Sequence, residues 1–241
     1  MAIVLTVVIG YSLFGAVQGT LKWTRDKDNK DILAEIEFSV LMLQVENGFI
    51  DIEKLSDSEY IELGRKAAEL INRIGKVATD NEHYFRNYFS RAPQSLSDMI
   101  DTIKNNDSMF KWRLMLPGDT VFHMFGDDGE FNVKFLSEDG FFEAIYNKKG
   151  ELLTKDNDPL NMGTFNYGSP ITNKSNHTNF DVNTYFKWGN AVEDTRRFLK
   201  TDPTTDDHLE PKGFHENREA VECFNELYKS VYGEDYVELL E

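Results

Sequence analysis

Residues 130–154, EFNVKFLSEDGFFEAIYNKKGELLT, decide the fold. From Phe131 to Phe135, apolar side chains alternate with Asn132 and Lys134. This alternation predicts a strand with one packed face and one wet face, as antiparallel sheets permit. The interruptions EDG and KKG place glycine where a tight turn needs a positive φ angle. The stretch therefore predicts consecutive antiparallel hairpins.

Similar short runs extend this pattern on both sides. KWRLML (111–116) and TVFHMF (120–125) precede it, and ELLT (151–154) ends it. Turn sequences containing glycine separate the runs. Together they predict an antiparallel meander of about five short strands, packed with C-terminal helices.

Helical patterns lie on both sides of the predicted sheet. Ser56 and Glu59 have capping-box spacing at the start of one helix. A further apolar pattern runs from Phe214 to Val231, and Gly233 is placed to end it. Before Ser56, one apolar stripe comprises Ile32, Leu33, Ile36, Val40 and Leu43. The fold class predicted is α+β, with an apolar segment at 1–21, a helical region at 22–110 and an α+β module at 111–241.

The first twenty residues carry no charged side chain. Their length fits a membrane span or signal anchor, with Lys22, Trp23 and Arg25 at the interface. A buried helix or strand is the second interpretation, because β-branched residues are frequent and Gly10 and Gly15 interrupt the run. A cleaved signal is the third, although a basic start and an A-x-A-like site are missing.

Composition limits the possible partners. The 241 residues are 40% hydrophobic, which suits a globular protein, and the formal net charge is −16. A strongly negative field repels phosphate backbones, so general binding to nucleic acid is disfavoured, although a nuclease with a small basic cleft is not excluded. The single cysteine, Cys223, cannot form an intrachain disulfide, and its apolar helical context predicts a small buried side chain.

Several common catalytic signatures are missing from the sequence. There is no phosphate-binding loop with GK[ST], no HExxH, no GxSxG and no paired CxxC. NTPases, common metalloproteases and α/β-hydrolases are therefore disfavoured. No metal site is predicted, and the sequence does not indicate a cofactor.

The candidate site is the aperiodic polar segment 161–197, which combines polar, aromatic and glycine residues. His177 and Asp181 are four residues apart, so the carboxylate could fix the imidazole tautomer and create an acid–base pair. The nearby groups predicted to bind substrate through hydrogen bonds or charge are Asn166, Tyr167, Asn190, Asp194 and Arg196. The alternative is that the same polar groups only cap turns and close one end of the sheet.

Residues 124–197 contain an uncommon series of short motifs and single residues: FGDDGEFNVKF, EAIYNKKGELLT, NMGTFNY, His177, FDVNTYFKWGN and Asp194. In this order they resemble an uncharacterised C-terminal module of bacterial secreted and polymorphic-toxin-like proteins. Asn183 and Thr184 stand where that module often has a proline. The resemblance implies a bacterial effector domain whose recurring polar positions match Asn166, His177, Asp181, Asn190 and Asp194.

Two functions follow as expectations. The first is a secreted or membrane-delivered toxin-like effector whose C-terminal module is a hydrolase of unknown substrate, with an immunity protein as a possible partner. The second is a non-enzymatic, membrane-anchored binding or structural module. Membrane contact would come from residues 1–21, and a cytoplasmic location is open if these residues are buried.

Overall fold

The computed structural model describes residues 30–75, 91–116, 131–158, 161–184 and 218–236. In these ranges the chain is mixed α+β, as predicted. The helices are α2 (Lys30–Glu46), η1 (Ile52–Lys54), α3 (Asp57–Ile74), α5 (Leu96–Asn105), α6 (Lys174–His177), the π-helix η4 (Thr178–Val182) and α9 (Arg218–Tyr232). The strands are β1 (Arg113–Leu114), β2 (Val133–Leu136) and β3 (Glu143–Tyr146).

Within these ranges the sheet has three antiparallel strands in the order β1-β2-β3. The prediction of about five strands is not supported. Residues 151 and 152 form only isolated bridges, to Ser95 and Tyr146, because the chain leaves the sheet soon after the turn at Gly150. The run 120–125 lies outside the described residues. Gly140 and Gly150 have φ angles of 80° and 79°, which confirms the predicted turn glycines.

The prediction of a wet face on β2 is wrong. All four residues of β2 and all four of β3 are buried. Asn132 and Lys134, expected to face water, are only 2% and 8% exposed. For Lys134, burial is tolerated because its ammonium is paired with a carboxylate on β3.

The helix ends follow the sequence signals. The capping box at α3 is present: the Ser56 hydroxyl accepts from the Glu59 backbone N–H, and the Glu59 side chain accepts from the Ser56 backbone N–H. At α5 the Ser95 side chain accepts from the Asp98 backbone N–H. Gly233 follows α9 with a φ angle of 75°, and its N–H donates to Lys229 O. Cys223 is exposed rather than buried, because α9 buries the neighbouring Phe224 instead.

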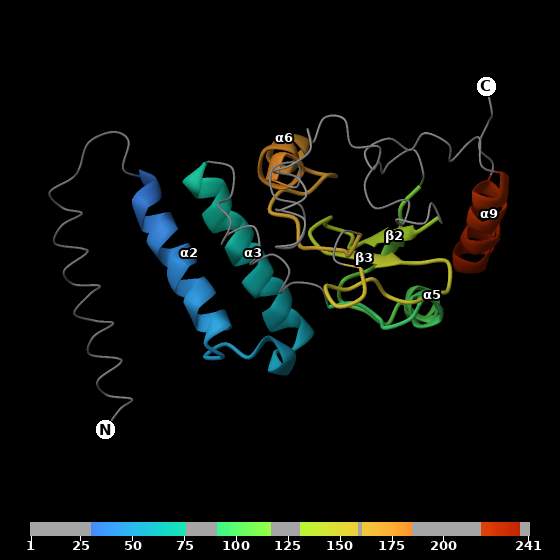
Figure 1. The fold of residues 1–241 in the computed structure, drawn as a ribbon, viewed down its shortest axis with the longest axis horizontal. Helices are drawn as coiled ribbons and strands as arrows, with labels where there is room; N and C mark the ends of the chain where they lie inside the picture. Colours follow the sequence, from blue (N-terminus) through green and yellow to red (C-terminus); the bar gives the residue numbers. More distant parts are fainter. Residues whose placement is uncertain (1–29, 76–90, 117–130, 159–160, 185–217, 237–241) are drawn as a thin grey trace, which may run out of the picture.

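One hydrophobic core joins the helical region to the α+β part. It includes Phe38 of α2, Tyr60 of α3, Phe135 of β2 and Phe224 of α9. Helices α2 and α3 pack side by side, and the sheet lies on the other side of α3, with α5 below the strands and α9 at the far right (Figure 1). Since both predicted regions contribute to one core, the candidate loop is positioned by helices from the N-terminal part.

None of the helices in the described ranges is long and apolar enough to cross a membrane. The membrane-span prediction concerns residues 1–21, which lie outside these ranges.

Candidate functional site

Segment 161–169 enters the site along the edge of β3. Phe165 forms an antiparallel bridge with Phe142, and Asn166 N donates to Phe141 O over 2.7 Å. Every residue from 161 to 169 is buried. The polar segment is therefore built into the molecule at this point, although its sequence has no strand period.

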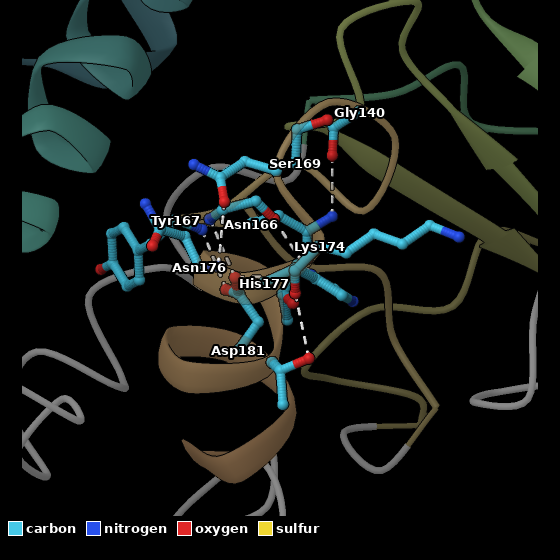
Figure 2. A network of polar contacts seen from close by, with 12 residues as sticks. Gly140, Asn166, Tyr167, Ser169, Lys174, Asn176, His177 and Asp181 are labelled. Atoms are coloured by element: carbon cyan, nitrogen blue, oxygen red, sulfur yellow. Dashed lines mark hydrogen bonds and ion pairs between the residues drawn. The ribbon is translucent and has the colours of Figure 1, made fainter.

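Asp181 lies in η4 and holds the turn that follows this edge. Its Oδ1 accepts from Tyr167 N and its Oδ2 from Gly168 N, each over 2.9 Å. The residue is 4% exposed. A carboxylate bound to two backbone N–H groups satisfies donors that would otherwise be buried without a partner. Figure 2 shows Asp181 beneath this turn, directed toward it.

His177 lies one helical turn before Asp181, and its Nδ1 is hydrogen-bonded to the carbonyl oxygen of Gly168. The distance from Nδ1 to Gly168 O is 3.0 Å, whereas that to Asp181 Oδ2 is 3.5 Å. A carbonyl oxygen only accepts, so in the neutral imidazole this contact places the proton on Nδ1 and the lone pair on Nε2. The predicted proximity of His177 and Asp181 is present, but the Gly168 carbonyl is the closer partner that orients the ring.

Gly168 is required by the close approach of two backbones. A Cβ at this position would collide with the backbone N of His177 and with Asn176. Only glycine lets the turn carry Gly168 N to Asp181 and Gly168 O to the imidazole. The structural role of Gly168 was not predicted. The sequence signal for it is the Tyr-Gly-Ser sequence at 167–169.

Asn166 and Tyr167 have partners inside the protein. Asn166 Nδ2 donates to Gly140 O over 2.9 Å and to Glu143 Oε1 over 3.1 Å. The Tyr167 ring is fully buried and packs edge-on against Phe38, with ring centroids 6.1 Å apart. Substrate binding by these two residues stays a prediction, and in this arrangement it would require the loop to open.

A buried ion pair next to Asn166 was missed by sequence reasoning. Lys134 Nζ lies 2.7 Å from Glu143 Oε1, and the two side chains are 9% and 3% exposed. In the strand register Lys134 is opposite Ile145 and Glu143 is opposite Leu136, so the pair lies diagonally on one face of the sheet. The sequence signal available for this ion pair was one basic residue and one acidic residue on adjacent predicted strands.

Asn72 and Asn176 tie the loop to α3 and were also not predicted. Asn72 Nδ2 donates to Tyr167 O over 3.0 Å and to Ala68 O over 2.7 Å. Asn176 Nδ2 donates to Asn72 Oδ1. A lone asparagine on an amphipathic helix gives no sequence signal for such a contact.

The remaining predicted binding residues, Asn190, Asp194 and Arg196, lie outside the described residues, and their roles stay predictions. Among the residues that are described, no group of three histidine, cysteine or acidic side chains is placed to hold a metal ion.

Comparison with known proteins provides no assignment. The chain matches no protein-family model, no curated protein and no solved structure.

Proposed function

We propose that the chain is a toxin-like bacterial effector, secreted or delivered to a membrane, whose C-terminal module is a hydrolase with His177 as its acid–base group. The observation that carries the proposal is the orientation of the imidazole. Nδ1 is held by Gly168 O, and the side chain is 21% exposed, which leaves Nε2 as the group available to a reactant.

The chemistry that this orientation supports is activation of a water molecule. Nε2 accepts a proton from water as the water attacks, and the resulting imidazolium keeps its Nδ1–H on the Gly168 carbonyl. The Asp181 carboxylate, 3.5 Å from Nδ1, stabilises the positive charge that forms. Asp181 thus acts on the reaction in two indirect ways: it stabilises the charge on the His177 imidazolium, and it holds the turn at Tyr167 and Gly168 that orients the imidazole.

The test is growth arrest caused by the full chain, since the loop packs on helices of the N-terminal part. Wild type should arrest a bacterial host when directed to the cytoplasm or to the periplasm. His177→Ala should abolish the arrest at equal protein level. Asn179→Ala, an exposed neighbour on η4, is the matched control and should arrest growth as wild type does. Absence of arrest by wild type in both compartments, or full arrest by His177→Ala, would reject the proposal.

A non-enzymatic binding or structural module is the second candidate. It is favoured by the burial of the other described site residues: Asn166, Tyr167 and Asp181 are 2%, 0% and 4% exposed. On this account the segment closes one end of the sheet, and His177 can be replaced without functional consequence. The growth experiment separates the candidates, because only the hydrolase requires His177. A co-expressed downstream gene product that relieves the arrest would identify the immunity partner expected of a toxin.

A further inference from the structure

Asn72 of α3 binds both chain segments that meet at the His177 imidazole. Its Nδ2 donates to Tyr167 O over 3.0 Å, and its Oδ1 accepts from Asn176 Nδ2. Tyr167 precedes Gly168, whose carbonyl oxygen contacts the imidazole, and Asn176 precedes His177 itself. Figure 2 shows Tyr167 and Asn176 close to His177. One amide therefore holds the neighbours of both residues whose hydrogen bond orients the ring.

The Asn72 amide has a single orientation that satisfies its surroundings. Its Nδ2 lies against two carbonyl oxygens, those of Tyr167 at 3.0 Å and Ala68 at 2.7 Å. Carbonyl oxygens only accept, so the amide nitrogen belongs on this side and Oδ1 faces the Asn176 amide nitrogen. The contact with Ala68, one turn earlier on the same helix, holds the side chain in this direction. The amide is thus fixed before the loop is considered.

The face of α3 that carries Asn72 permits a close approach of segment 165–167. Gly64, Ala68 and Asn72 follow one another at a spacing of four, so they lie on one face of the helix. A Cβ added at Gly64 would lie only 2.9 Å from the Phe165 ring, and Ala68 is 3% exposed. Small residues at 64 and 68 therefore let the segment come within hydrogen-bonding distance of the amide at 72.

We propose that Asn72 is a positioning residue that keeps the neutral His177 ring in the Nδ1–H tautomer, with the lone pair on Nε2. Without the amide, Tyr167 O and the Asn176 side chain lose their common partner, and the Gly168 carbonyl can move away from the imidazole. The catalytic meaning of this role rests on the proposed hydrolase function. The orientation of His177 then depends on α3, a helix that precedes the expected module at 111–241.

Nitrogen NMR of the full chain at a pH where the ring is neutral tests the proposal. The His177 signals are assigned by their loss in His177→Ala. The Nδ1–H form should predominate in wild type, and its share should fall at least about twofold in Asn72→Ala. The matched control is Asn47→Ala: Asn47 Nδ2 donates to Leu43 O, also four residues earlier, from an exposed position just after α2. This control should keep the wild-type share.

Asn176→Ala removes the contact from the loop side without changing α3, and it carries the test if Asn72→Ala does not fold. It should lower the Nδ1–H share in the same direction. Equal shares in wild type and in the folded variants at these two positions would overturn the proposal. A wild-type ring mainly in the Nε2–H form would overturn it as well.

The growth experiment separates this proposal from the hydrolase function. Full arrest by His177→Ala, together with a changed tautomer in Asn72→Ala, would reject the hydrolase and support the positioning role. Loss of arrest in His177→Ala, together with an unchanged tautomer in Asn72→Ala and Asn176→Ala, would support the hydrolase and overturn the positioning role.

Discussion

Asp181 in the loop and Glu143 in the sheet are both buried carboxylates, and they are held in different ways. Asp181 accepts from two backbone N–H groups of the adjoining turn. Glu143 is paired with the Lys134 ammonium and accepts from the Asn166 amide. The loop therefore depends on its carboxylate for shape, whereas the Glu143 carboxylate compensates the buried Lys134 ammonium and also accepts from Asn166 in the loop. A buried carboxylate thus holds an adjoining turn in the loop, whereas in the sheet it compensates a buried positive charge.

The largest expected effect is at the ion pair. Glu143→Leu leaves the Lys134 ammonium buried without its counter-charge and should lower the free energy of unfolding by about 3–5 kcal/mol. The double variant Lys134→Met/Glu143→Leu should cost less than Glu143→Leu alone, because no uncompensated charge remains. Urea denaturation of the full chain measures both. Additive costs in the double variant would contradict the pairing.

Asp181→Ala should destabilise the chain by about 3 kcal/mol, because it leaves the N–H groups of Tyr167 and Gly168 buried without acceptors. No second substitution restores this loss, in contrast to the ion pair. The control is Asp156→Ala, an exposed loop carboxylate, which should change the free energy by less than about 0.5 kcal/mol. Equal costs in the same urea titration would show that the two amides do not depend on Asp181.

Gly168→Ala tests the close approach of Gly168 to the His177 backbone. This approach positions the Gly168 N–H on Asp181 and the Gly168 carbonyl on the imidazole. The added Cβ collides with the His177 backbone, so the turn must shift, at a cost of about 2 kcal/mol. Gly48→Ala meets nothing within 4 Å but has a φ angle of 70°, and should cost about 1 kcal/mol from backbone strain alone. Thermal unfolding ranks the two. A larger cost at Gly48 would argue against tight packing at Gly168.

The smallest effect is expected at Glu59, an exposed carboxylate that serves as a reference for the two buried ones. Hydrogen bonds from the Ser56 side chain and backbone lower the Glu59 pKa from its ordinary value of 4.5. Its contribution is therefore present above the unfolded-state pKa and is lost as the pH falls through the lowered value. Glu59→Gln should remove this small pH dependence from unfolding measured between about pH 7 and pH 3. An unchanged pH profile would contradict the role of the capping box.

The sequence predicts those parts of the fold that local chemistry determines. The Ser56 capping box and the glycine turns at 140 and 150 are each specified by a few adjacent residues. The prediction of about five strands is not supported within the described residues, and the predicted wet face of β2 was wrong, because both depend on what packs over the sheet. Lys134 has the sequence position of a solvated side chain, and only its position diagonal to Glu143 explains its burial.

The candidate site was predicted in part for the same reason. The proximity of His177 and Asp181 follows from their spacing within one helical turn. The involvement of Gly168 and Asn72 depends on segments that meet only after folding, so no local pattern indicates it. The apolar stripe identified in the sequence of α2, which includes Val40 and Leu43, is on the exposed side of this helix, and no local pattern indicates that the opposite side faces α3.

Asp181 fixes, through the amides of Tyr167 and Gly168, the turn that orients His177, the proposed acid–base group. Residue-resolved amide exchange by NMR on wild type, Asp181→Ala and His177→Ala tests the dependence of this turn on Asp181. We expect strong protection of both amides in wild type and in His177→Ala, and its loss in Asp181→Ala. Rapid exchange of these amides in wild type, or equal loss of protection in His177→Ala, would contradict it.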